Sequence, residues 1–301
     1  MDEVSQYSMI ATTLETMDIV LFYASKKNLA FCLAAWDDDA SSMHPVKNLA
    51  GNLRLKAFRR DTQRMAEHLI AHRSFAPEDV TLINATADTK AEDIIKIFEG
   101  IQAVVDEARD ESYLVTFSYS GHGTFSADYS GDELAQGEGP DAKSGGFGMF
   151  GRRRPPRNLD FGPTSSTLVL LLDCCHSGSM MDLKYKYVSS DGGKTYEPTK
   201  ARKKAAEGAK GGKLVSVSAC TDNQEAYFGP SEGNLTAALL NSWAAKGTTA
   251  PILQGGLFPK VREQVVDMTN GKQEPVLCSN FVFNKACNLF DCANWEQEKA
   301  E

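Results

Sequence analysis

The stretch Leu168-Val169-Leu170-Leu171-Leu172-Asp173-Cys174-Cys175-His176-Ser177-Gly178 decides the fold of this chain. Its first five residues are branched aliphatics without a break. Such a run is typical of a strand buried on both faces, and strands of that kind lie inside parallel sheets. Cys175 follows the strand directly. Because loops and helix N-termini converge at the carboxyl edge of an open α/β sheet, we expect Cys175 to lie where a ligand site forms.

A second apolar strand ends in a histidine. Residues 114–119, Leu-Val-Thr-Phe-Ser-Tyr, lead into Ser120-Gly121-His122-Gly123. In a parallel sheet this strand brings His122 to the same edge as Cys175, which pairs a base with a nucleophile. Small residues around both side chains leave backbone N–H groups free, and those near Gly123 and Cys175 are candidates for binding an oxyanion.

The neighbours of Cys175 have other roles. Adjacent side chains on a strand point to opposite faces, so Cys174 is expected to be inert core, which is the commonest fate of a cysteine. His176 diverges from Cys175 for the same reason, and we assign it a structural role in the turn. Asp173 lies on the same face as Cys175 and its carboxylate can bind a cationic side chain of a substrate.

Strands and helices alternate along the chain. We expect strands at 28–36, 80–84, 114–119, 168–172, 214–219 and 275–279, and helices at 61–72, 89–108, 234–245 and 258–268. This order predicts an α/β fold, a three-layer α/β/α sandwich around a mostly parallel sheet. Residues 1–27 form an N-terminal extension before this core.

Two segments lack the pattern. Residues 126–163 are rich in Gly, Asp and Pro without a hydrophobic period, which predicts a surface loop or disordered insert. Residues 184–213 are rich in lysine with little to anchor them, which predicts a solvated linker.

Composition narrows the class of protein. The chain has 301 residues, 42% hydrophobic and 24% charged, as in ordinary globular proteins. We expect a soluble cytoplasmic monomer that binds no membrane, because no apolar run is long enough to span one and the polar N-terminus lacks a signal-peptide layout. A net charge of −8 argues against nucleic acid as a partner. Seven scattered cysteines do not make a disulfide scaffold or a Cys-x-x-Cys metal site.

The two strand ends resemble those of the metacaspases, the caspase-like cysteine peptidases of clan CD. Further similarity lies in residues 55–65, a turn into the first helix where Arg60 replaces the usual asparagine and Asp61 keeps the acid, and in residues 214–224, which resemble the start of the small subunit. The resemblance covers most of residues 28–280. It implies a large subunit region at 28–183, a processing linker at 184–213 and a small subunit region with the C-terminal tail at 214–301.

The resemblance also implies a reaction. A His122/Cys175 dyad would cleave proteins or peptides after Arg or Lys, with Asp61, Ser120 and Asp173 matching the pocket for the basic residue. From the sequence alone, Asp61 is about equally well read as an N-cap or first-turn acid of its helix. The alternative function is a catalytically weak homologue that acts as a binding or scaffold protein, suggested by Arg60 and by the insert.

Calcium and self-processing complete the expectations. Many metacaspases are stimulated by calcium, and Asp182 matches one ligand, with Asp128, Asp132 and Glu133 as weaker candidates from the insert. A zymogen would cut itself in the basic linker. The candidate sites there are Lys194, Lys200, Arg202, Lys203, Lys204, Lys210 and Lys213.

Overall fold

The computed structural model describes the central part of the chain with gaps. The described residues are 11–12, 28–34, 51–72, 75–84, 96–100, 103, 113–127, 143–147, 166–178, 180–181, 183–201, 212–229, 231–247, 250–253, 255–282 and 287–290.

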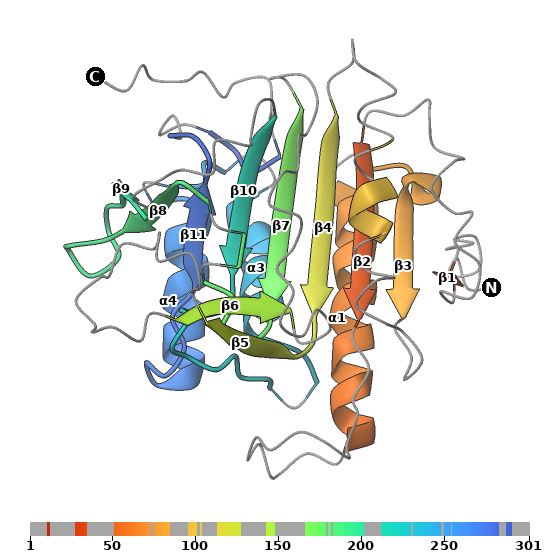
Figure 1. Ribbon diagram of the computed structural model, residues 1–301, viewed down its shortest axis with the longest axis horizontal. Helices are drawn as coiled ribbons and strands as arrows, with labels where there is room; N and C mark the ends of the chain where they lie inside the picture. Colours follow the sequence, from red (N-terminus) through yellow and green to blue (C-terminus); the bar gives the residue numbers. More distant parts are fainter. Residues whose placement is uncertain are drawn as a thin grey trace.

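Nine strands of the described residues form one sheet (Figure 1). In spatial order they are β1 (Ala11–Thr12), β3 (Val80–Asn84), β2 (Asn28–Ala34), β4 (Leu114–Ser120), β7 (Thr167–Asp173), β10 (Lys213–Ser218), β11 (Val276–Ser279), β8 (Tyr185–Val188) and β9 (Glu197–Lys200). All pairs from β1 to β10 are parallel, and β11, β8 and β9 continue the sheet in antiparallel pairs. The mostly parallel sheet expected from the sequence is confirmed.

Helices cover both faces of the sheet. Figure 1 shows α1 (Gly51–His72), α3 (Asn234–Lys246) and α4 (Leu257–Thr269) behind it. The core on that side contains Val169 and Leu171 of β7. The other core takes the alternate β7 leucines together with Ile97 and Phe98 of the helical residues 96–100. The three-layer α/β/α arrangement follows from this alternation, because a strand buried on both faces needs cover on both.

The helix that carries Asp61 is longer than expected. We expected it to begin at residue 61, but α1 begins at Gly51. Ala57 and Phe58 are buried one turn before Asp61, so the apolar stripe that continues through Met65 starts earlier than the sequence suggested. Asp61 therefore lies in the middle of the helix, and its alternative role as an N-cap or first-turn acid is wrong.

The expected linker is in part a β-hairpin, which corrects the prediction of a solvated segment. Strands β8 and β9 pair with each other, and β8 extends the main sheet beyond β11. Tyr185, Tyr187 and Tyr196 are buried, and the Tyr196 ring packs edge-on against Phe258 at 5.2 Å. These aromatic anchors bury enough apolar area to hold the segment despite its lysines. Residues 202–211 lie outside the described residues.

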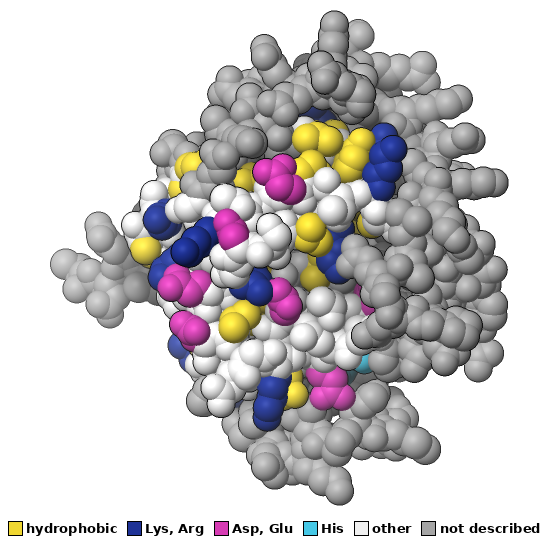
Figure 2. All heavy atoms as spheres, turned by 90° about the vertical axis from the view of Figure 1, so that its left-hand side faces the viewer, with side chains coloured by type: hydrophobic (Ala, Val, Ile, Leu, Met, Phe, Trp, Pro, Cys, Tyr) yellow, Lys and Arg dark blue, Asp and Glu magenta, His cyan; other side chains and the backbone are white. Residues whose placement is uncertain are grey.

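The lysine-rich hairpin lies on a surface of mixed charge. Figure 2 shows this edge of the molecule, where the described basic and acidic side chains are interspersed.

The 126–163 insert also holds more structure than expected, because β5 (Gly123–Ala127) and β6 (Lys143–Phe147) pair as a small antiparallel sheet. Within the described parts, no helix has the length and apolar character that crossing a membrane requires.

Candidate active site

The ends of β4 and β7 meet at the carboxyl edge of the sheet. Ser120 is in register with Asp173, and the Gly121 N–H continues the ladder by donating to the Asp173 carbonyl at 3.2 Å. The Gly123 backbone then passes so close to Cys175 that a Cβ atom on Gly123 would lie 1.7 Å from the Cys175 carbonyl oxygen. Only glycine fits there, and the close approach places His122 and Cys175 on adjoining turns.

Cys175 is held as a thiol. Its Sγ accepts a hydrogen bond from the Ala226 N–H at 3.3 Å and lies 3.8 Å from the Ala226 carbonyl oxygen. Burial raises the pKa of Cys175 to about 11, with smaller contributions from the negative charges of Glu225 and Asp173, and against the lowering effect of the Ala226 N–H. Because the thiolate is the nucleophile, this sulfur needs a base that takes its proton when a substrate is bound.

Aromatic contacts orient His122, the candidate base. Its ring meets Phe58 edge-on, with centroids 5.4 Å apart and an interplanar angle of 87°. Phe58 in turn contacts Phe228 at 4.9 Å. The His122 carbonyl accepts a hydrogen bond from the Tyr119 hydroxyl at 2.8 Å. Phe58 and Phe228 were missed by sequence reasoning, because an aromatic residue on a helix face gives no signal that separates a core contact from a contact with a catalytic ring.

The two neighbours of Cys175 have the structural roles that the sequence indicated. Cys174 is fully buried in the core that faces away from Cys175. His176 is buried in a left-handed conformation, with φ 54°. Its N–H donates to the Gln224 carbonyl at 3.1 Å, and its Nδ1 lies 2.8 Å from the Asp222 carbonyl oxygen. These contacts hold the turn that presents Cys175.

Asp61, Ser120 and Asp173 are brought together beneath the start of α3. The Ser120 hydroxyl donates to Asp61 Oδ2 at 2.7 Å, and the Gly233 N–H donates to the two Asp61 oxygens at 3.1 and 3.0 Å. Thr236 donates to Asp173 Oδ2 from its N–H at 2.9 Å and its hydroxyl at 2.8 Å. The three predicted pocket residues are only 1 to 2% exposed.

The two carboxylates also cap α3. Gly233 precedes the helix and has no side chain with which to bind the free N–H groups of the first turn. Asp61 and Asp173 supply those acceptors, and negative charge is favourable at a helix N-terminus. A Cβ atom on Gly233 would lie 2.1 Å from Asp173 Oδ2, so the close packing depends on glycine. Sequence reasoning missed Gly233 and Thr236, because their partners come from distant parts of the chain.

Burial makes the acid pair electrostatically unfavourable. Desolvation raises the pKa of Asp173 to about 6, and the hydrogen bonds from Thr236 oppose this. Desolvation and then the charge of Asp173 raise the pKa of Asp61 well above its usual range, opposed by Ser120, Gly233 and Arg64. Asp173 Oδ1 is buried without a hydrogen-bond partner among the described residues. A buried carboxylate pair with an unfilled acceptor binds a proton or a cation.

A family model for the caspase domain matches residues 47–286 of this chain. The chain belongs to the caspase-domain family. It is 26% identical over 185 residues to Metacaspase-1 of Candida glabrata, an alignment that covers 60% of this chain and 45% of that protein. The chain thus spans less than half of the length of this curated relative. Among solved structures, protein GSU0716 of Geobacter sulfurreducens superposes with a TM-score of 0.54 at 20% identity, over 88% of this chain and 98% of the other.

The family match confirms the metacaspase resemblance and the caspase-like fold, and it identifies the chain as a member of a cysteine peptidase family. The structural likeness at 20% identity supports the fold alone. In the structure, the turns that carry His122 and Cys175 lie next to each other at the carboxyl edge of the sheet.

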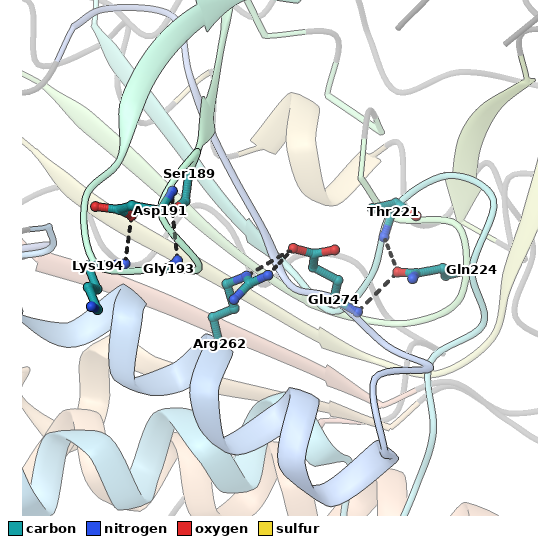
Figure 3. A network of polar contacts seen from close by, with 8 residues as sticks. All are labelled: Ser189, Asp191, Gly193, Lys194, Thr221, Gln224, Arg262 and Glu274. Atoms are coloured by element: carbon teal, nitrogen blue, oxygen red, sulfur yellow. Dashed lines mark hydrogen bonds and ion pairs between the residues drawn. The ribbon is translucent and has the colours of Figure 1, made fainter. Parts of the chain in front are cut away.

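A polar bridge fixes the loop over Cys175. Figure 3 shows Gln224 Oε1 accepting from the N–H groups of Thr221 and Glu274, at 3.3 and 3.0 Å. The Glu274 carboxylate pairs with Arg262 on α4, at 2.9 Å to Nε. The loop whose Ala226 contacts the Cys175 sulfur is thereby connected to α4.

The remaining candidates are only partly described. Lys194 lies in the tip of the β8–β9 hairpin, Lys200 ends β9 and Lys213 begins β10, whereas Arg202, Lys203, Lys204 and Lys210 lie outside the described residues. The calcium candidates Asp128, Asp132, Glu133 and Asp182 also lie outside them. Elsewhere, in the part of the chain that the structure describes, no group of three His, Cys, Asp or Glu side chains is arranged to hold a metal ion.

Proposed function

We propose that the protein is a cysteine endopeptidase that cleaves after Arg or Lys. The observation that supports this best is the buried pair of Asp61 and Asp173: Asp173 ends β7 two residues before Cys175, and its Oδ1 has no hydrogen-bond partner among the described residues. A guanidinium or ammonium group would take the place of the proton that the pair otherwise needs. A substrate with aspartate before the scissile bond would add a third carboxylate and be repelled.

The reaction follows from the arrangement of the dyad. On substrate binding, Cys175 Sγ gives its proton to His122 and leaves its hydrogen bond with Ala226. The thiolate adds to the peptide carbonyl, and N–H groups near Gly123 and Cys175 hold the oxyanion. The intermediate collapses to an acyl-enzyme as His122 protonates the leaving amine. Water, deprotonated by His122, then hydrolyses the thioester and restores the thiol.

Peptide hydrolysis tests the proposal. Fluorogenic peptides ending in Arg or Lys should be cleaved by the wild type and left intact by Cys175→Ala. Equal rates from both preparations, or no cleavage by either across a range of calcium concentrations, would contradict the proposal.

The competing function, a scaffold with a weak or dead site, is favoured by one observation. Asp61 and Asp173 are almost fully buried and already bind the start of α3, so a substrate side chain reaches them only if the segment 228–233 yields. An Arg-based covalent probe separates the two functions. Labelling of Cys175 excludes a dead site, and failure to label a folded, reduced protein supports the scaffold.

Self-processing is part of the proposal, and the fold reduces the number of candidate cleavage sites. Lys200 and Lys213 are in paired strands. Lys194 sits in a turn whose backbone is bound by Asp191. A peptidase needs a free, extended segment, so these bonds are poor substrates in the folded chain. The first cut is expected after Arg202, Lys203, Lys204 or Lys210, as intact mass measurements would show.

Calcium stimulation, a monomeric state and a cytoplasmic location also remain proposals. Calcium rests on the resemblance at Asp182, and no step of the reaction above depends on it. Peptidase activity in calcium compared with activity in a chelator tests calcium stimulation. Light scattering after gel filtration tests the monomeric state. Fractionation of the source cells tests the cytoplasmic location.

A further inference from the structure

An ion pair lies near the buried acids Asp61 and Asp173. Arg64 follows Asp61 by one turn of α1, and its guanidinium pairs with the carboxylate of Glu232, the residue before Gly233. The two side chains are 33% and 23% exposed, in contrast to the nearly buried Asp61 and Asp173. The pair therefore joins α1 to the residues just before α3, at a partly exposed position.

Backbone contacts connect Glu232 to the residues on both sides of its turn. The Gly229 N–H donates to the Glu232 carbonyl at 2.8 Å, and Phe228 and Gly233 form an antiparallel bridge. The Asn234 N–H donates to the Tyr227 carbonyl at 3.2 Å. The Glu232 side chain is thus linked through its own backbone to Gly233, whose amide binds Asp61.

Arg64 also balances the charge of the pocket. The groups that face Asp61 are the carboxylate of Asp173 on β7, the hydroxyl of Ser120 on β4, the Gly233 amide with the nearby Glu232, and Arg64 on α1 itself. Burial raises the pKa of Asp61 most, and Arg64 is the cation among the groups that oppose this rise. One side chain therefore both anchors the turn and favours the ionised form of the pocket acid.

We propose that Arg64 and Glu232 form a latch that positions the 228–233 turn over the acid pair, and thereby determines how well a basic substrate side chain is bound. Both are positioning residues that act through Gly233 and Asp61. This inference rests on the proposed Arg/Lys specificity, but its anchoring part is independent of any activity.

Four variants, the combination of the first two and a control separate the two effects of the latch. Arg64→Gln removes both the ion pair with Glu232 and the positive charge near Asp61. Glu232→Gln removes the ion pair but keeps the positive charge of Arg64, and Arg64→Lys keeps both the ion pair and the charge. The exchanged pair Arg64→Glu/Glu232→Arg restores an ion pair but puts a carboxylate beside Asp61. Arg59→Gln is the control, since Arg59 is exposed on another side of the same helix.

Amide hydrogen exchange of residues 226–235 measures how strongly the Arg64–Glu232 ion pair stabilises this segment. Arg64→Gln and Glu232→Gln should speed exchange by about fivefold, as expected for one partly exposed ion pair. Their combination should be no faster than either single variant, because both remove the same contact. Arg64→Lys, Arg59→Gln and the exchanged pair should stay near the wild type. Unchanged exchange in both single variants, or additive effects in the combination, would overturn the latch.

Enzyme kinetics measure how the ion pair affects the binding of a basic substrate side chain. For an Arg peptide, Arg64→Gln should lower KM by about fivefold with little change in kcat, because the turn that covers Asp61 and Asp173 then yields more easily. The pH midpoint of kcat/KM should move upward in Arg64→Gln and further in the exchanged pair, and not in Arg64→Lys. Unaltered KM and pH midpoint in Arg64→Gln would refute the positioning role. If the wild type cleaves no Arg or Lys peptide, the proposed function fails, and exchange alone still decides whether the latch exists.

Discussion

Replacing Asp173 with Asn should stabilise the protein and at the same time remove its activity on basic substrates. The Asp173 carboxyl is 2% exposed, and burial raises its pKa from 3.8 to about 6. The asparagine amide oxygen can still accept the two hydrogen bonds from Thr236, and the neutral side chain no longer raises the pKa of Asp61. The substitution therefore removes an unfavourable buried charge and keeps the helix cap.

The magnitude follows from the two pKa values. A carboxyl whose pKa is higher in the folded state binds its proton more tightly when folded, so ionisation disfavours folding. The penalty is absent below pH 3.8, grows up to about pH 6 and is complete above it. At about 1.4 kcal/mol per pH unit, it reaches about 3 kcal/mol at neutral pH.

Thermal unfolding monitored by circular dichroism between pH 3.5 and 7.5 checks this prediction. Asp173→Asn should melt about 5 °C above the wild type at pH 7.5, and the two curves should converge near pH 3.5. Its kcat/KM for Arg and Lys peptides should fall sharply, while alkylation of Cys175 by iodoacetamide stays nearly unchanged. A variant that is less stable than the wild type at neutral pH, or that keeps its activity, would refute the reasoning.

Asp191→Asn is a control of opposite sign. Hydrogen bonds from the Thr195 N–H and hydroxyl, and from Ser189, hold the pKa of the exposed Asp191 carboxyl well below its usual range. A lowered carboxyl pKa stabilises the folded state at neutral pH, and this contribution is lost as the pH falls. Asp191→Asn should therefore lower the melting temperature at pH 7.5 and leave peptide cleavage unchanged.

Three further predictions follow from the packing around the site. Gly233→Ala should abolish cleavage of basic peptides because its Cβ would lie 2.1 Å from Asp173 Oδ2, whereas Gly229→Ala, with its nearest atom at 3.5 Å, should be tolerated in the same assay. The alkylation rate of Cys175 should keep rising with pH toward about 11, and a plateau near neutral pH would show a resting thiolate instead. After a cut within 202–211 the two fragments should co-elute in gel filtration, because β10 and β11 of one lie between β7 and β8 of the other; separate elution without denaturant would contradict this.

The sheet and the turns that carry His122 and Cys175 were predictable because their signals are local. The aliphatic run of β7 and its alternation placed Cys175 and Cys174 on opposite faces, and the glycines around His122 marked the second turn. The pattern of apolar residues also predicted α1, although the predicted start of this helix lay ten residues after its observed start at Gly51.

What sequence reasoning missed depends on contacts between distant segments. Lysines suggested a linker where the buried Tyr185, Tyr187 and Tyr196 build a hairpin, because anchors spaced over a turn show no period in a short window. The pairing of Gly233 with Asp61 joins residues 172 positions apart, and nothing near either residue indicates it. Such pairings are determined by tertiary packing rather than by local propensity.

Cleavage specificity measured on one peptide series tests the central claim most directly. The series should share a sequence and differ only in the residue before the scissile bond, as Arg, Lys, Gln or Asp, and be assayed with the wild type and with Cys175→Ala. We predict cleavage of the Arg and Lys peptides by the wild type alone, with the Gln and Asp peptides left intact. Efficient cleavage of the Asp peptide, or activity that survives in Cys175→Ala, would contradict the assignment of the pocket or of the nucleophile.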